Sequence, residues 1–194
     1  RALQAEMGLA VRDDLPLLGC IARLVPQKGI DLILDILSEL IHLPVQLVFL
    51  GSGIPELEDR LRYACASAPG SVAGRIGFDE GLAHRIEAGS DLFLMPSRFE
   101  PCGLNQLYSL RYGTPPLVHH SGGLADSIVD THEASLADGT ATGFVFSPPT
   151  PWALLDAVRR ALHCYRQPEQ WTKVVRTAMA QDFSWNHSAR SYLR

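Results

Sequence analysis

The sequence predicts an α/β fold with a Rossmann-like, doubly wound parallel sheet. Short apolar runs of strand length alternate along the chain with longer segments in which apolar residues have helical spacing. The apolar runs are continuous rather than alternating, which is typical of parallel strands covered by helices on both faces. No internal repeat, low-complexity segment or linker divides the 194 residues, so we expect one domain over residues 1–194.

The first half of the chain begins this alternation. Strands are predicted at residues 17–22, 45–50 and 72–76, where apolar residues dominate. Helices are predicted at residues 3–7, 31–41 and 55–68. Apolar residues between 31 and 41 recur every three or four positions and so form one face of a helix. Pro55 suits the first turn of the last of these helices, because its missing N–H needs no partner there.

The second half continues in the same way. Strands are predicted at residues 91–95, 117–119 and 143–146. Helices are predicted at residues 80–88, 104–112, 152–165 and 169–179, with another that Gly122-Gly123 opens and a further segment that starts near Ser184. Residues 131–142 are polar and are predicted to be irregular. Trp152 and Trp171 fall at helical spacing, so we expect both rings to pack at least half buried rather than to form an exposed carbohydrate platform.

Composition narrows the possible partners. Hydrophobic residues make up 46% of the sequence, which is enough for a substantial core. The net charge of −4 gives no general positive field, so no nucleic-acid partner is expected. No apolar run approaches the roughly 20 residues of a membrane span, so no membrane partner is expected either. The four cysteines form no C-x-x-C pair, which favours free thiols in a reducing compartment and no metal site.

The stretch 91–113 joins a buried strand to a helix through a turn-rich loop that carries Glu100. In open α/β sheets, ligands bind at the carboxyl ends of the strands, where this loop lies. The start of the following helix offers free backbone N–H groups and a positive dipole end, which favour anions. A carboxylate beside an anion-binding backbone suits a ligand with one hydroxyl-rich and one phosphate-rich part. A nucleotide sugar is such a ligand.

Three motifs carry a resemblance to a known family. They are Ala-Arg-Leu-Val-Pro-Gln-Lys-Gly at 22–29, the stretch 91–113, and Ser-Gly-Gly-Leu-Ala-Asp-Ser at 121–127. In this order they resemble the C-terminal half of bacterial glycogen synthases and plant starch synthases, retaining glucosyltransferases of family five with the GT-B fold. The resemblance implies a donor lobe that binds ADP-glucose, while an N-terminal lobe outside this chain binds the α-1,4-glucan acceptor. It also implies a cytoplasmic enzyme, or a plastid one if the source is a plant or alga.

The charged residues of these motifs are the candidate catalytic groups. Arg23 offers a planar fork and Lys28 a mobile point charge, although lone Arg and Lys residues are usually solvated. The resemblance implies that both bind the diphosphate, stabilise its charge as it leaves, and make a metal cofactor unnecessary. It implies that Glu100 holds the donor glucose and supports positive charge at the reacting carbon, without acting as a covalent nucleophile. A charge placed at the helix start for the dipole alone is the other interpretation of Glu100.

The remaining candidates are nucleotide-binding residues, and they are Gly51, Gly53, Phe78, Cys102, Gly103 and Leu104. The backbone of the last three would bind the distal phosphate, although the Cys102 side chain is expected to have a packing role. The resemblance places Phe78 beside the base, and a core position is the alternative. Gly122-Gly123 is a weaker candidate for a second phosphate- or sugar-facing turn. His119 and His120 are expected to be structural or surface residues.

Two other functions remain open. One is another GT-B glycosyltransferase, such as a family-four enzyme, but that group usually has a second Glu where this chain has Tyr108. The other is a non-catalytic nucleotide- or glucan-binding module. Such a module would be free to lose the three charged residues Arg23, Lys28 and Glu100, and all of them are present.

Overall fold

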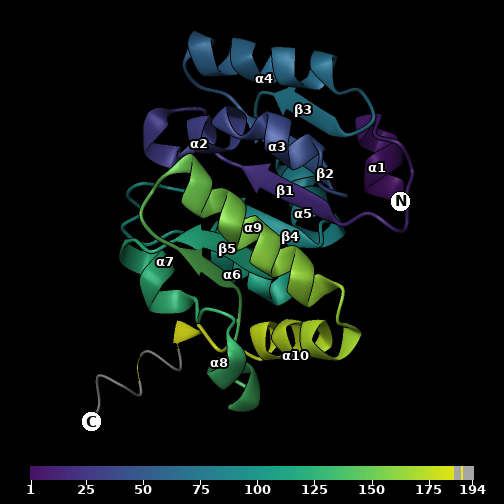
Figure 1. Cartoon of the computed structure of the whole chain (residues 1–194). Helices are drawn as coiled ribbons and strands as arrows, with labels where there is room; N and C mark the ends of the chain where they lie inside the picture. Colours follow the sequence, from purple (N-terminus) through teal and green to yellow (C-terminus); the bar gives the residue numbers. More distant parts are fainter. Residues whose placement is uncertain (186–188, 190–194) are drawn as a thin grey trace.

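The strands form one parallel sheet in the order β3-β2-β1-β4-β5-β6 (Figure 1). The computed structural model describes residues 1–185 and 189. The strands are β1 (Leu17–Ile21), β2 (Gln46–Gly51), β3 (Val72–Ile76), β4 (Leu92–Met95), β5 (Pro116–His119) and β6 (Phe144–Phe146). The chain builds outward from β1 to β3 and then returns to place β4 on the other side of β1. The predicted doubly wound sheet is therefore confirmed, and its order reverses between β1 and β4.

Helices cover both faces of the sheet (Figure 1). They are α1 (Ala2–Met7), α2 (Ile30–Asp35), α3 (Leu37–Ile41), α4 (Pro55–Ser67), α5 (Glu80–Gly89), α6 (Asn105–Tyr112), α7 (Gly122–Ser127), α8 (Glu133–Ala137), α9 (Pro151–Tyr165) and α10 (Pro168–Met179). A short 3-10 helix, η1 (Pro26–Lys28), precedes α2. Within the described part of the chain, no helix has both the length and the apolar character to cross a bilayer.

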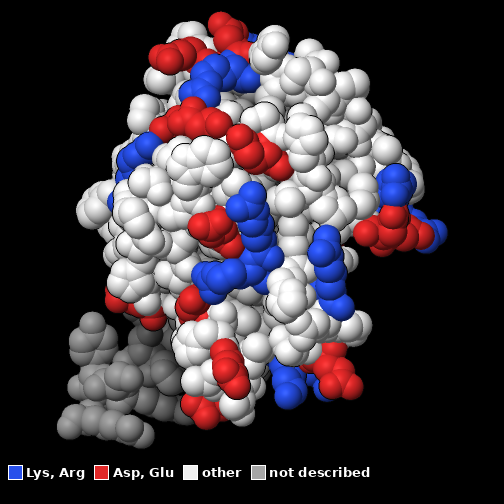
Figure 2. Space-filling model, viewed as in Figure 1, with Lys and Arg blue, Asp and Glu red and all other residues white. Residues whose placement is uncertain are grey.

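Acidic and basic side chains are intermingled on the face that α9 covers (Figure 2). Several exposed pairs lie within one helix, such as Arg159–Asp156 in α9 (3.3 Å) and Arg62–Asp59 in α4 (2.6 Å). Such exposed pairs contribute at most about 1 kcal/mol each. The stability of the fold therefore comes chiefly from the apolar core.

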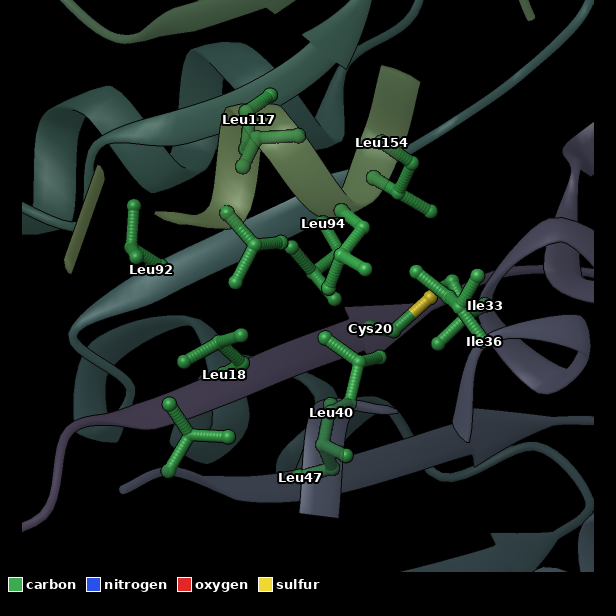
Figure 3. Packing of buried hydrophobic residues seen from close by; sticks show 14 of the residues in the cluster. Leu18, Cys20, Ile33, Ile36, Leu40, Leu47, Leu92, Leu94, Leu117 and Leu154 are labelled. Carbon is green, nitrogen blue, oxygen red and sulfur yellow. The ribbon is translucent and has the colours of Figure 1, made fainter. Parts of the chain in front are cut away.

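The core consists of one apolar cluster on each face of the sheet. Along β2, Leu47 and Phe49 belong to one cluster, while Val48 and Leu50 belong to the other. This alternation follows from the two-residue period of a strand. Part of the first cluster is shown in Figure 3, where Cys20 of β1 points toward Ile33 of α2 and Ile36. Each fully buried Leu or Ile side chain stabilises the fold by roughly 2 kcal/mol.

Two helices differ from the sequence prediction. The helix expected at 31–41 is broken at Ile36 (φ −109°, ψ 17°) into α2 and α3. Ile33, Ile36 and Leu40 still share one cluster, so the periodicity predicted the buried face but not the continuity of the backbone. The expectation that residues 131–142 are irregular was wrong, because α8 forms there.

The cap of α8 explains why its pattern was missed. The backbone N–H of Ser135 donates to His132 Nδ1 (3.3 Å), and the N–H of His132 donates to Ser135 Oγ (3.0 Å). This is a reciprocal capping box, but His replaces the usual Ser or Thr at its first position. The segment expected to begin near Ser184 falls largely on residues outside the described ones.

The two tryptophans have different environments. Trp171 is partly buried as predicted, and its ring packs against Phe144 (ring centroids 6.3 Å apart) and Tyr165 (5.1 Å). The prediction for Trp152 was wrong, since its side chain is 62% exposed. Trp152 lies in the first turn of α9. The core contacts in this part of the helix are made by Leu154 and Leu155 instead.

Candidate active site

A cavity of about 330 Å³ opens at the carboxyl edge of the sheet. It is lined by the ends of β1, β2 and β4, the loops that follow them, the loop between β3 and α5, and the start of α6. β1 and β4 are the neighbours between which the strand order reverses. The cavity therefore lies where open α/β sheets bind their ligands.

Glu100 and Lys28 form an ion pair inside this cavity. Lys28 Nζ contacts Glu100 Oε2, and the two side chains are only 20% and 10% exposed. The hydroxyl of the buried Ser97 donates to the same carboxylate oxygen (3.1 Å). These side chains come from the loops after β1 and β4, so the reversal of strand order is what brings them together.

Arg23 is the second cation of the cavity. Its side chain is exposed and lines the cavity wall, just after β1. Within the described residues, no acidic side chain forms an ion pair with Arg23. The cavity thus has one cation that is paired with a carboxylate and one that is available to an anionic ligand.

Arg98 fixes the two charged loops to each other. Its guanidinium donates to both carboxylate oxygens of Asp31 (2.7 and 2.6 Å) and to the Pro26 carbonyl (2.6 Å). The hydrogen bonds with Asp31 raise the pKa of Arg98. The Arg98 backbone N–H also donates to the Gln27 carbonyl (2.9 Å). Arg98 therefore joins the loop that carries Lys28 to the loop that carries Glu100. The sequence alone did not indicate this role for Arg98.

Glycines let the backbones of these loops approach closely. A Cβ atom on Gly29, whose φ is +70°, would lie 2.0 Å from the Pro96 carbonyl oxygen. A Cβ atom on Gly122 would lie 2.2 Å from the Glu100 carbonyl oxygen, which also accepts a hydrogen bond from the Gly123 N–H (3.0 Å). Gly122-Gly123 therefore supports the Glu100 loop from behind and is not part of the cavity wall.

Most of the residues predicted as ligand contacts line the cavity, and these are Arg23, Lys28, Gly51, Phe78, Glu100, Gly103 and Leu104. Phe78 is 90% exposed at the cavity, so the alternative of a core position was wrong. The contact of the Phe78 ring with the nucleotide base stays a prediction. Sequence reasoning missed Ser52, Asp79 and Ser97, which also line the cavity, because lone polar residues in loops carry no distinctive pattern.

Gly53 and Cys102 lie outside the cavity wall. The Gly53 N–H donates to Glu58 Oε1 (2.9 Å), and a Cβ atom there would meet the Leu24 carbonyl oxygen at 2.1 Å. Cys102 is exposed, so the expected packing role of its side chain was wrong. Its carbonyl accepts a hydrogen bond from Gln106 Nε2 (2.9 Å), which ties the loop to the first turn of α6.

The N-terminus of α6 faces the cavity through Gly103, Leu104 and Asn105. Gly103 has a φ of 76°, a left-handed conformation that side chains other than Gly rarely adopt. The first N–H groups of a helix have no intrahelical acceptor, and the positive end of the dipole adds to their attraction for anions. The arrangement thus places helix N–H groups, the cations Arg23 and Lys28, and the Glu100 carboxylate around a single cavity.

These features define a ligand-binding α/β domain of the doubly wound class, with an anion-binding side and a carboxylate side. The family model for "Glycosyl transferases group 1" matches residues 7–177, and the chain belongs to this family. The chain is 58% identical over 191 residues to the glycogen synthase of Nitrosospira multiformis and 55% identical over 194 residues to that of Aromatoleum aromaticum. These matches cover 98% and 100% of this chain but only 38% and 39% of the two relatives.

Solved structures agree with this assignment. The catalytic domain of starch synthase IV from Arabidopsis thaliana, bound to ADP and acarbose, superposes with a TM-score of 0.90 at 37% identity. The match covers 99% of this chain and 40% of that chain. A sucrose-phosphate synthase from Thermosynechococcus elongatus superposes with a TM-score of 0.71 at 20% identity, which shows a shared fold. The resemblance to the C-terminal domain of glycogen and starch synthases is therefore confirmed.

The Lys28–Glu100 pair makes a prediction about stability. Lys28→Ala is expected to lower the free energy of unfolding by about 1–3 kcal/mol, because the nearly buried carboxylate then lacks its cation. Urea unfolding followed by tryptophan fluorescence would measure the change. In the double variant Lys28→Ala/Glu100→Gln, most of the loss should be recovered. Arg159→Ala, at an exposed pair in α9, is the matched control and should cost under about 0.5 kcal/mol. Unchanged stability of Lys28→Ala would show that the pair contributes nothing.

Proposed function

We propose that this chain is the donor-nucleotide lobe of a retaining glucosyltransferase. In this proposal the enzyme transfers glucose from ADP-glucose to the non-reducing end of an α-1,4-glucan. The observation that carries it is the meeting of Arg23, Lys28 and Glu100 in one cavity at the carboxyl edge of the sheet. The relatives named glycogen synthase, and a starch synthase structure with bound ADP, support the choice of substrate.

Each part of the donor would meet suitable chemistry. The diphosphate would lie between Arg23 and Lys28, with the N-terminus of α6 nearby. The exposed ring of Phe78 would stack on the base. Glu100 would accept hydrogen bonds from the glucose hydroxyls. Lys28, which contacts Glu100, would turn from the carboxylate toward the diphosphate of a bound donor.

Catalysis would use charge stabilisation rather than a covalent intermediate. The bond from the anomeric carbon to the phosphate oxygen breaks while a bond to the acceptor hydroxyl oxygen forms on the same face. The acceptor proton passes to the leaving phosphate oxygen. Glu100 would oppose the positive charge at the anomeric carbon, and Arg23 and Lys28 would oppose the negative charge on the diphosphate.

In the same proposal, Arg23 and Lys28 together neutralise the diphosphate, so the reaction would proceed without a metal cofactor. The acceptor glucan would bind to a second, N-terminal lobe outside this chain. We place the enzyme in the cytoplasm, or in the plastid for a plant or algal source. The second lobe is proposed because the relatives are about two and a half times as long as the part that this chain matches.

The test of the proposal is nucleotide binding without glucan extension. In calorimetric titrations the chain should bind ADP at least about tenfold more tightly than UDP. Incubation with labelled ADP-glucose and glycogen should give no incorporation, because closure of two lobes is needed to exclude water and align the reactants. ADP binding no tighter than UDP binding would contradict the choice of donor. Incorporation by the chain alone would contradict the need for a second lobe.

A hybrid synthase completes this test. In it, the chain replaces the matching 191 residues of the Nitrosospira multiformis glycogen synthase. The hybrid should extend glycogen from ADP-glucose, and its turnover should stay within about twofold when EDTA is added. A hybrid that folds and binds ADP but transfers no glucose would contradict the proposed function. A large loss of turnover with EDTA would contradict the metal-free part alone.

A further inference from the structure

The carboxylate of Glu100 is held by one of its two oxygens. Lys28 Nζ and Ser97 Oγ both contact Oε2, the latter at 3.1 Å. Among the described residues, no protein group forms a hydrogen bond or ion pair with Oε1. Two contacts on one oxygen hold that oxygen in place and leave the other oxygen for a ligand in the cavity.

Ser97 is itself held in place by the neighbouring strand. It is 3% exposed and lies after β4, separated from its last residue by Pro96. Its carbonyl oxygen accepts a hydrogen bond from Nδ1 of His119, the last residue of β5 (2.9 Å). His119 is 6% exposed and packs against Phe146 of β6, with ring centroids 5.5 Å apart. Because the acceptor is a carbonyl, Nδ1 carries the proton, and the serine loop is anchored to rigid sheet.

Lys28 and Ser97, which both contact Oε2, should respond differently when a donor binds. Lys28 is a mobile cation, and a diphosphate in the cavity would attract it away from Glu100. Ser97 is short, uncharged and buried, so its hydrogen bond would persist after Lys28 moves. The serine is thus the contact that can keep the carboxylate aimed during the reaction.

We propose that Ser97, anchored by His119, is a positioning residue that directs Glu100 Oε1 toward the donor sugar. This inference rests on the proposed function, since it requires that the cavity holds the glucose of a nucleotide sugar. It adds two residues that act through Glu100: Ser97 lines the cavity beside the carboxylate, and His119 lies outside the cavity wall. Their removal should therefore affect sugar recognition and leave nucleotide recognition intact.

Calorimetric titration of the chain with ADP and with ADP-glucose tests this division. Ser97→Ala should keep ADP affinity within about twofold and lose about five- to tenfold in ADP-glucose affinity. Ser97→Thr retains the hydroxyl and should restore most of the ADP-glucose affinity. Ser109→Ala is the matched control, because Ser109 is also buried but donates to the Gln106 carbonyl (2.9 Å) within α6. It should change neither affinity.

His119→Phe extends the test to the anchor. It keeps an aromatic ring beside Phe146 but removes the donor to Ser97, so it should reproduce the selective loss in a weaker form, about threefold. Thermal unfolding of each variant shows whether it is folded. Equal weakening of ADP and ADP-glucose binding by Ser97→Ala would overturn the proposal, because it would indicate a general structural role. Unchanged ADP-glucose binding would overturn it as well.

The outcome for the unsubstituted chain separates this inference from the function on which it rests. If that chain binds both ligands and Ser97→Ala shows no selective loss, only the positioning role is overturned. If that chain binds neither ADP nor ADP-glucose, the proposed function is overturned and the positioning role with it.

Discussion

Glu100→Gln in the hybrid synthase is expected to lower kcat by about 100- to 1000-fold, nearly as much as Glu100→Ala. Glutamine keeps the shape of the side chain, and its carbonyl oxygen can still accept the hydrogen bond that Ser97 donates to Oε2. What it lacks is the negative charge. If the carboxylate stabilises positive charge at the anomeric carbon, an amide in the same place should give almost no stabilisation of the transition state.

ADP binding is the control for this prediction. ADP has no glucose, so its affinity for the Glu100→Gln chain should stay within about threefold of the unsubstituted chain. Loss of the Lys28–Glu100 pair frees Lys28 for the diphosphate, so any small change should be toward tighter binding. Near-normal turnover of Glu100→Gln would show that hydrogen bonding, not charge, is what the site uses. A glucosyl ester trapped on Glu100 would replace the same-face mechanism with double displacement.

The strands and the loops between them could be predicted because a buried strand requires a continuous run of apolar residues in the sequence. Strands such as β2 and β4 are covered on both faces, so every position from 47 to 51 in β2 and from 92 to 95 in β4 is apolar and the run is conspicuous. The position of Glu100 after β4 then placed it at the carboxyl edge without further information. Arg23 and Lys28 followed in the same way from β1.

Contacts between loops could not be predicted, because they depend on which strands become neighbours. Lys28 and Glu100 are 72 positions apart, and so are the two residues joined by the Gln27 Nε2 hydrogen bond to the Phe99 carbonyl. Their meeting requires β4 to lie beside β1, and no local pattern states that order. The contact of Arg98 with Asp31 was missed for this reason, although Arg98 lies within the stretch that the sequence marks as important.

Errors at helix starts have a different cause. Helical periodicity predicts that an aromatic side chain is buried when its spacing matches the apolar face. The first turn of a helix, however, can extend beyond the edge of the sheet on which the helix packs. Trp152 is at such a position and is exposed, whereas Trp171 lies one turn inside α10 and is partly buried. Spacing alone cannot distinguish them, since the end of the sheet beneath the helix is set by residues elsewhere in the chain.

Arg23→Ala and Lys28→Ala in the hybrid synthase are each expected to lower kcat by about 30- to 1000-fold, which corresponds to roughly 2–4 kcal/mol. The donor KM should change much less, because each charge matters most when the diphosphate leaves. Arg12→Ala is the matched control, since Arg12 is exposed and pairs with Asp14 (2.6 Å) away from the cavity. It should leave both constants unchanged.

The two cations should differ in one respect. Arg23 has no acidic partner among the described residues, so its loss should weaken ADP binding by the full value of one phosphate contact. Lys28 must leave Glu100 to reach the diphosphate, so the lost ion pair offsets part of what Lys28 gains from the phosphate. Lys28→Ala should therefore weaken ADP binding less than Arg23→Ala. Titration of both variants with ADP measures this difference. A raised donor KM with unchanged kcat in either variant would show that the cation only binds the donor. Equal losses of ADP affinity would show that the ion pair with Glu100 does not compete with the diphosphate.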